Sequence, residues 1–299
     1  MPTLLVTGAN GHLGRRLLAA SGEASWTTRA IVRSERAAAQ VAGHPDVRIV
    51  DYGDIAGLTD ACANCDAIVH LVGIIKEGGG ATYRSAHVEA TQALLEAATN
   101  AAVKRIVYLS ILGAQEGSRN RCLATKALAE SLLARGPIPS LVLRVPMVLG
   151  EGDYAAASLL GNARKRTALT FRGESMEQPI YAGDVVDAVL AGLATDAPTG
   201  VLELAGPQAL PRSDLIAVAS AVGTRTVSLP LALGYGVAAL LGALSPNPPL
   251  TADMLGVLDH DDDIDPEPAA NALGIRLTGL TETLARIALP LPPKGMHRL

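Results

Sequence analysis

Short apolar runs of strand length recur along the first half of the chain, separated by longer segments with apolar residues at helical spacing. The run at 67–75 is almost unbroken, which is typical of a central parallel strand covered on both faces. The alternation therefore predicts an α/β fold built on a doubly wound parallel sheet with helices on both faces. The predicted strands are 4–7, 26–32, 47–50, 67–75, 103–109 and 140–146.

The pattern changes after residue 150, where predicted strands and helices become shorter and less regular. We expect residues 1–150 to form the core domain. Residues 151–299 are expected to supply the remaining strands, interleaved with a small C-terminal lobe for a substrate or a partner, and 154–178 looks like lobe material. The other predicted elements are helices at 82–100, 121–135 and 210–222 and a strand at 201–204.

A glycine-rich turn lies between the first predicted strand and the helix that follows it, in the stretch TLLVTGANGHLGRRL. Glycines at this point let a pyrophosphate approach the free N–H groups and the positive end of the helix, and the third glycine lets the helix pack close on the strand. The stretch predicts a dinucleotide-binding turn in preference to an ordinary strand-to-helix turn. Its expected coenzyme contacts are Thr7, Gly8, Asn10, Gly11, His12, Leu13, Gly14 and Arg15.

The end of the second predicted strand carries arginines where domains specific for NAD place an acid that binds the ribose 2'-hydroxyl. Arg33 occupies this position, and Ser34 and Arg36 follow. A carboxylate repels a 2'-phosphate, whereas a guanidinium binds one through two parallel hydrogen bonds. The sequence therefore favours NADP(H), and NAD(H) is the alternative coenzyme. The alternative without a ligand is that these arginines are simply solvated.

Composition narrows the class of protein. The 299 residues are 49% apolar and 18% charged with a single Phe and a single Trp, so Ala, Leu and Val must fill the core. A net charge of −4 gives no electrostatic case for binding nucleic acid. Because the chain passes from Met1-Pro2 directly into a strand, with no room for a signal peptide, we expect a cytoplasmic protein.

Outside the glycine turn, few side chains suggest a catalytic, redox or metal-binding role. Cys62 and Cys65 have C-x-x-C spacing, but no second pair exists, and we expect packing at a helix end in preference to a redox or metal role. We expect His70, inside a strand, to be a buried and hydrogen-bonded histidine, and Asp184 to cap a helix. The acidic run at 259–267 lacks the ligand spacing of a calcium loop and is expected to be a solvated loop, so no metal site is predicted.

Residues 226–252 carry no charged side chain. Their helical part, about 14 residues at ~1.5 Å each, reaches roughly 21 Å and cannot span a hydrocarbon layer of ~30 Å. We expect it to pack as a helix of the lobe. The alternative is a contact with a membrane protein or the bilayer surface through 229–244, which would make the protein peripherally membrane-associated.

Several motifs together resemble the atypical and extended short-chain dehydrogenases/reductases, a superfamily that includes NAD-dependent epimerases and dehydratases. They are TGANGHLG, AIVHLVGI, VKRIVYLSILGA, the helix sequence TKALAE and the closing ALGI-x-x-TGLTETL. In this combination the chain resembles the group related to the NADPH-binding accessory subunit of mitochondrial complex I and its bacterial relatives. The resemblance implies a Rossmann fold with a small C-terminal lobe, tightly held NADPH and a structural or regulatory role linked to respiratory or quinone functions.

The resemblance also implies further coenzyme contacts. Asp54 and Ile55 match an element that cups the adenine, and Ser110 matches the first serine of a strand-end cluster. The carboxyl end of the fourth predicted strand should lie along the ribose, because ligands bind at that edge of a parallel sheet. The contacts expected beyond the glycine turn and the arginines are Asp54, Ile55, Leu71, Val72, Gly73, Ser110, Lys126, Pro146, Met147 and Val148.

The proton-transfer machinery of these enzymes is incomplete in this sequence. Active members carry Tyr-x-x-x-Lys on the helix at 121–135; Lys126 fits the lysine, but Cys122 stands in place of the tyrosine, and Leu112 falls where the catalytic serine is usual. Cys122 beside a lysine could ionise more readily and act as a substitute acid or base. Tyr154 and Tyr181 could also supply the acid from elsewhere.

Two functions follow from the sequence. The first is a dinucleotide-binding subunit or sensor without catalysis, which uses the coenzyme for stability and docks through its apolar tail. The second is an NADP(H)-dependent oxidoreductase acting on a small apolar substrate, with Lys126 holding the ribose; an epimerase or dehydratase is a third possibility that the absent tyrosine weakens. The substrate is not predicted by any motif, and no nucleic acid is expected.

Overall fold

The computed structural model describes residues 1–245, 248–257 and 259–288. Its centre is a seven-stranded sheet with the order β11-β6-β5-β4-β1-β2-β3, in which all neighbouring strands are parallel. This order confirms the predicted doubly wound α/β fold. The strands are β1 (Thr3–Thr7), β2 (Thr27–Val32), β3 (Val47–Ile49), β4 (Ala67–His70), β5 (Arg105–Ile111), β6 (Ser140–Val145) and β11 (Gly200–Glu203).

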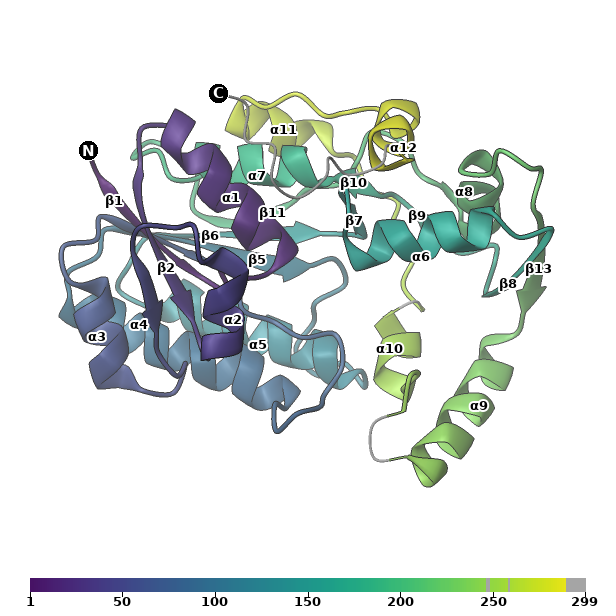
Figure 1. The fold of residues 1–299 in the computed structure, drawn as a ribbon, viewed down its shortest axis with the longest axis horizontal. Coiled ribbons are helices and arrows are strands. Elements are labelled where there is room, and N and C mark those ends of the chain that lie inside the picture. Colours follow the sequence, from purple (N-terminus) through teal and green to yellow (C-terminus); the bar gives the residue numbers. More distant parts are fainter. Residues whose placement is uncertain (246–247, 258, 289–299) are drawn as a thin grey trace.

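Helices cover both faces of this sheet (Figure 1). Alternate residues of β1 face opposite sides, so Leu4 and Val6 pack in one core cluster and Leu5 in the other. The first cluster lies under α1 (His12–Glu23), α7 (Ala182–Ala191) and α11 (Glu267–Leu273). The second lies under α3 (Ile55–Cys62), α4 (Ala90–Asn100) and α5 (Arg121–Arg135).

The fourth strand is shorter than the apolar run predicted. β4 ends at His70, level with the end of β1 at Thr7, and residues 71–75 leave the sheet. The backbone of Leu71 passes so close to Gly8 that a Cβ on Gly8 would lie 3.1 Å from the Leu71 carbonyl. The apolar residues that extend the run therefore line a loop over the sheet edge and do not extend the strand.

The long helix predicted at 82–100 divides into a π-helical segment (Arg84–Glu89) and α4. Helix α5 has the predicted bounds. The helix predicted at 210–222 is the shorter α8 (Arg212–Val218). Cys62 and Cys65 are both buried at the junction of α3 and β4, as predicted. The short elements beside the sheet are α2 (Glu35–Ala38) and a 3-10 turn (Ala39–Val41).

The C-terminal lobe has its own small apolar core, formed by residues such as Leu149, Leu159 and Leu215. Strands β8 (Thr167–Phe171) and β13 (Arg225–Leu229) pair in parallel beside α8 and α6 (Tyr154–Ala163). The remaining elements of the lobe are β7 (Val148–Leu149), β9 (Met176–Glu177), β10 (Ile180–Tyr181), β12 (Leu210–Pro211) and α12 (Leu280–Ala288).

Two polar segments behave differently from the sequence prediction. Asp184 does not cap α7: it is the third residue of the helix, and its carboxylate accepts hydrogen bonds from the backbone N and the hydroxyl of Thr278, at 2.6 and 2.7 Å. The acidic run is not simply solvated either. Arg172 pairs with Asp259 and Asp261, and Asp261 also accepts from the Ser175 hydroxyl at 2.7 Å. The first contact fastens Thr278 to α7 on the central sheet, and the second fastens the acidic run to the lobe.

Helix α9 (Leu231–Leu244) projects from the end of β13 and contacts α10 (Ala252–Val257), as Figure 1 shows. Of its residues only Gly234 and Ala238 are buried, while Leu240 and Leu244 are 62% and 74% exposed. The expectation that this helix packs within the lobe is therefore wrong for most of its surface. Among the described residues, no helix combines the length and the apolar character that crossing a membrane requires.

Candidate functional site

The glycine turn between β1 and α1 is closely packed, and its backbone has no room for side chains at two positions. Gly8 has a φ of +67°, which an L side chain rarely adopts. A Cβ on Gly14 would lie 2.5 Å from the Gly8 carbonyl oxygen and 2.7 Å from that of Ala9. The third glycine thus allows the helix to pack on the strand, as the sequence predicts.

The N-terminus of α1 is suited to an anion. Gly11 is its N-cap, and within the described ranges no side chain caps it and no acid lies in its first turn. Burial and the neighbouring Arg15 lower the pKa of His12. Arg16 pairs with Glu151 at 2.6 Å, whereas Arg15 has no ion-pair partner among the described residues. The unsatisfied N–H groups, the helix dipole and Arg15 together favour a phosphate here.

Two cavities meet at this turn. The first has a volume of about 360 Å³ and the second about 320 Å³. Both are lined by Gly8, Gly11 and Leu71, so they form one groove that crosses the carboxyl ends of β1 and β4. A groove divided at the helix N-terminus suits an extended dinucleotide with its pyrophosphate in the middle.

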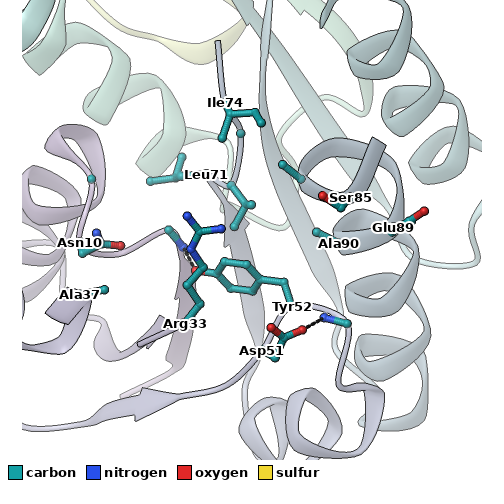
Figure 2. Close-up of a pocket in the computed structure, with 16 residues that line it drawn as sticks. Asn10, Arg33, Ala37, Asp51, Tyr52, Leu71, Ile74, Ser85, Glu89 and Ala90 are labelled. Carbon is teal, nitrogen blue, oxygen red and sulfur yellow. Dashed lines mark hydrogen bonds between the residues drawn. The ribbon is translucent and has the colours of Figure 1, made fainter. Parts of the chain in front are cut away.

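The first cavity holds the groups that the sequence places at the adenosine end. Figure 2 shows Arg33 reaching into the space between Asn10 and Tyr52. Arg33 is exposed and, within the described part of the chain, pairs with no carboxylate. A guanidinium without a partner inside a coenzyme cavity is available for a phosphate.

Tyr52 is a contact that sequence reasoning missed. Its hydroxyl accepts a hydrogen bond from the backbone N of Gly8 at 2.9 Å and donates one to the Ile31 carbonyl at 3.2 Å. Burial raises the pKa of Tyr52. The phenol therefore ties the glycine turn to the end of β2. Its position directly after the third strand was the available signal, since such positions border the ligand in parallel sheets.

The predicted adenine element is displaced by three residues. Asp54 caps α3 by accepting from the backbone N of Gly57 at 3.0 Å, and neither Asp54 nor Ile55 lines a described cavity. Asp51, Tyr52 and Gly53 line the cavity instead. Asp54 fits the motif, but its carboxylate caps the N-terminus of α3, where the backbone N–H groups need an acceptor.

The structure gathers about half of the predicted coenzyme contacts in the groove. Others are engaged elsewhere: the Thr7 hydroxyl is 2.7 Å from His70 Nδ1, and the Ser34 hydroxyl accepts from the Ala37 N at 3.3 Å to cap α2. Arg36 is exposed, and Arg15, Pro146 and Met147 line neither cavity. The predicted residues that do line it are Gly8, Asn10, Gly11, His12, Leu13, Gly14, Arg33, Leu71, Val72, Gly73 and Val148.

The groove also has linings that the sequence did not predict, besides Tyr52. Most come from the loop after β4, the π-helical segment before α4 and the start of α6. They include Ile74, Ile75, Ser85, Glu89, Leu109, Asp153 and Ala182. Tyr154, one of the two tyrosines that the sequence offers as an alternative acid, also lines the second cavity, and Tyr181 lines neither.

Ser110 faces away from the groove. It is buried, and its hydroxyl donates to Glu130 at 2.5 Å. Glu130 also pairs with Arg144, which reaches Glu203 at 3.2 Å. The structure therefore does not bring Ser110 to the groove, because the neighbouring carboxylate holds its hydroxyl within this buried network.

Lys126 lies at the edge of the groove. Its ammonium donates to the Leu109 carbonyl at 2.9 Å and lies 4.6 Å from the centre of the Tyr108 ring. A Cβ on Gly73, which lines the first cavity, would be only 3.0 Å from Lys126 Nζ. Burial lowers the pKa of Lys126 to about 8. The backbone of Gly73 therefore separates the amine from the position that the sequence predicts for the ribose.

Cys122 does not become a stronger acid beside this lysine. Its thiol is buried and donates to the Ile74 carbonyl at 3.6 Å. Burial raises its pKa to about 11, an effect larger than the lowering by Lys126. The expectation that Lys126 makes the thiol ionise more readily is therefore wrong. Leu112, at the serine position, is also buried.

His70 and Tyr181 have structural partners. His70 lies between the hydroxyls of Thr7 and Thr91, and burial lowers its pKa to about 3, which confirms a buried, hydrogen-bonded histidine. The Tyr181 hydroxyl donates to Glu151 at 2.8 Å. Within the described ranges, no three His, Cys, Asp or Glu side chains come together as a metal site.

Comparison with known proteins indicates the kind of ligand that the chain binds. Residues 8–166 match a family model described as NAD(P)H-binding. The ceramide reductase of Caulobacter vibrioides is 26% identical over 206 residues, 67% of this chain and 63% of that protein. Subunit 9 of the NADH dehydrogenase [ubiquinone] 1 alpha subcomplex of Arabidopsis thaliana mitochondria is 25% identical over 170 residues, 55% of this chain and 42% of that protein.

A solved structure of an NADPH-dependent quinone oxidoreductase from Escherichia coli, complexed with NADPH, has the same fold. It superposes with a TM-score of 0.72 at 23% identity, over 94% of this chain and 98% of the other. The chain spans about three fifths of the length of the first curated relatives it matches.

The lowered pKa of Lys126 predicts a distinctive dependence of stability on pH. Between pH 8 and 10.5 the unfolded chain keeps a proton on Lys126 that the folded chain has released. The free energy of unfolding therefore increases as the pH rises through this window. Lys126→Met lacks this contribution. We expect the stability of the variant relative to wild type to fall as the pH rises from 8 to 10.5, measured by urea unfolding.

Lys104→Met, at an exposed lysine paired with Asp66, controls for the loss of one positive charge. A difference between wild type and Lys126→Met that stays constant across the window would contradict the lowered pKa.

Proposed function

The chain belongs to the NAD(P)H-binding family, and from this premise we propose that it is an NADP(H)-dependent reductase acting on a carbonyl group of an apolar substrate. Family membership confirms the predicted nicotinamide coenzyme and the resemblance to atypical short-chain dehydrogenases. The phosphorylated form of the coenzyme, the reaction and the substrate class are the proposal.

The second cavity is the observation that carries this proposal. It continues the coenzyme groove beyond the glycine turn, toward the end where the nicotinamide would lie. Leu13, Leu71, Ile75, Leu109 and Val148 line it, so its walls are mainly apolar. A protein that only holds a coenzyme has no need of an open apolar space beside the reactive ring, whereas a reductase needs it for the substrate.

The relatives support the same class of reaction. One is named as a reductase of ceramide, an apolar lipid, and the structural neighbour is named as a quinone oxidoreductase. Both names describe reduction of a carbonyl-type or apolar compound. We carry over the reaction class and the apolar character of the substrate, and no particular compound.

Arg33 supports NADP(H) over NAD(H). It lies in the first cavity without a carboxylate partner among the described residues, next to the turn that would hold the pyrophosphate. Lys126, behind Gly73, would donate to a ribose hydroxyl. When bound, the coenzyme supplies the hydride; these residues bind it and orient its nicotinamide end into the second cavity.

A coenzyme-holding structural or regulatory protein is the second candidate function. Cys122 occupies the position of the usual acid. Its buried thiol has a pKa of about 11 and is a weak hydrogen-bond donor. A coenzyme bound only to the folded state would still stabilise the protein by mass action. The similarity to a plant complex I subunit favours this role.

Helix α9 supports a contact with a lipid surface in either case. A helix that is apolar on every side is normally buried in a core or in lipid. α9 is apolar throughout and carries no charge, yet most of its surface is exposed. It is too short to span a bilayer, so we propose that residues 229–244 lie in the interfacial layer of a membrane.

Replacing Arg33 tests the coenzyme preference. Arg33→Ala should weaken NADPH binding about ten- to hundredfold, because charge-assisted hydrogen bonds to the 2'-phosphate contribute about 1.5–3 kcal/mol. NADH, which lacks that phosphate, should bind to the variant as to wild type. Calorimetric titration with both coenzymes measures the difference, and Arg135→Ala, an exposed arginine at the far end of α5, is the control. Equal losses for the two coenzymes would contradict the role.

Turnover separates the two candidate functions. We expect the purified protein to oxidise NADPH in the presence of long-chain ketones or quinones, measured by loss of nicotinamide absorbance. Lys126→Ala should abolish the activity, and Cys122→Ala should retain it because the thiol takes no part. Tight NADPH binding that raises the unfolding temperature, with no turnover of any probe, would refute the reductase and support the structural role.

Vesicle sedimentation tests the lipid contact. Wild type should sediment with phosphatidylcholine vesicles, and a variant with Leu233, Leu240 and Leu244 replaced by Ser should remain in solution. Val218→Ser/Val222→Ser removes exposed apolar side chains at the end of α8 and just after it, and is the matched control. Sedimentation of neither wild type nor variant would exclude lipid, and recovery of wild type only with protein-containing membranes would indicate a protein partner instead.

A further inference from the structure

Reduction of a carbonyl needs a proton as well as a hydride, and the usual phenol is absent from α5. The chain has six tyrosines, all within the described ranges. Three of them donate their hydroxyls to fixed acceptors: Tyr52 to Ile31, Tyr83 to Ile75 and Tyr181 to Glu151. Each of these phenols is committed to holding the fold.

The other three differ in where they lie. Tyr108 is fully buried between His70 and Lys126, with no access to the groove. Tyr235 belongs to α9, outside the groove. Tyr154 alone among the six lines the second cavity.

Tyr154 is held at the cavity by its place in the chain. It is the first residue of α6, directly after Asp153, whose carboxylate accepts from the backbone N of Ala156 at 2.6 Å and so fixes the start of the helix. The side chain is 78% exposed, and within the described ranges its hydroxyl has no hydrogen-bond partner. The phenol is thus positioned by the helix start while its hydroxyl stays free.

The second cavity is also part of the coenzyme groove. Tyr154 shares the cavity with Gly8, Gly11, Leu71 and Leu109, which border the positions expected for the pyrophosphate and the nicotinamide. A substrate held in this cavity would therefore share one space with the phenol and with the expected position of the hydride donor. The positive end of α6 would favour the negative charge that the phenol acquires when it loses its proton.

We propose that Tyr154 is the proton donor of the reductase, an inference that rests on the function proposed above. The carbonyl carbon of the substrate accepts a hydride from the reduced coenzyme, and the π electron pair moves to the carbonyl oxygen. The Tyr154 O–H bond breaks, and its proton goes to that oxygen, which gives the alcohol, the oxidised coenzyme and a phenolate. The phenolate regains a proton from water, which its exposure allows.

His12 is the other titratable donor in this cavity, and its surroundings disfavour the role. Burial and the nearby Arg15 and Arg16 lower its pKa, which disfavours the protonated imidazolium that would donate the proton. His12 also follows the N-cap of α1, where its backbone serves the pyrophosphate. The phenol is the better placed acid.

Removing the hydroxyl tests the chemistry. Tyr154→Phe keeps the ring and should lower kcat for a long-chain ketone about a hundredfold or more, the usual contribution of a general acid, with the NADPH dissociation constant unchanged within twofold. Tyr181→Phe, which removes a phenol that lines neither cavity, should retain most of the kcat. A Tyr154→Phe variant with wild-type kcat, or a comparable loss only in His12→Asn, would overturn the proposal.

A second measurement tests the geometry without any substrate. Tetranitromethane nitrates exposed tyrosines, and mass spectrometry reports the extent at each residue. NADP+ should protect Tyr154 at least fivefold, whereas adenosine 2',5'-bisphosphate, which fills only the adenosine end, should not; Tyr235, 37% exposed, is the internal control.

The turnover and nitration measurements together distinguish failure of the Tyr154 proposal from failure of the reductase proposal. Protection by NADP+ without turnover of any probe would leave Tyr154 at the nicotinamide end but remove the reductase function and the proton-donor role with it. Turnover without protection, or equal protection by both nucleotides, would keep the reductase and refute Tyr154.

Discussion

The close approach of the β1–α1 turn to its neighbours is the constraint on which the coenzyme groove depends. Gly14 brings the first turn of α1 against the carbonyls of Gly8 and Ala9, and Gly8 in turn lies against the backbone of Leu71. These contacts place unsatisfied N–H groups at the point where the two cavities meet. Any side chain at either glycine would separate strand, helix and loop and would destroy the anion site between them.

Hydrophobic patterning predicted the sheet because burial on both faces leaves a strong signature in β1, β4 and β6. It failed where apolar residues serve another purpose. Leu71–Ile75 continues the apolar run of β4, yet the chain leaves the sheet there, level with the end of β1 at Thr7. The apolar character of these residues lines a groove, and a one-dimensional pattern cannot distinguish a buried strand from a cavity wall.

Motif matching predicted the site well where backbone geometry decides and less well where side chains have a choice of partners. The glycines and Arg33 lie in the groove as expected. Asp54 and Ser110 fit their motifs equally well but bind a helix terminus and a buried carboxylate. Which acceptor or donor a short polar side chain takes depends on neighbours distant in sequence, such as Glu130 for Ser110, and these are fixed only by the packed fold.

Polar contacts link the helices α9 and α10 to the segment after β4. Arg121 pairs with Glu77, in the segment after β4, and with Asp253 of α10, at 3.0 and 2.7 Å. Asn120 also donates to the Asp253 carbonyl, so α10 and the attached α9 are held against the segment whose beginning lines both cavities. An apolar substrate dissolved in a membrane has low solubility in water. A lipid-facing helix tied through α10 to this segment would hold the protein at the surface in which such a substrate dissolves, and the exposed phenol would still regain its proton from water.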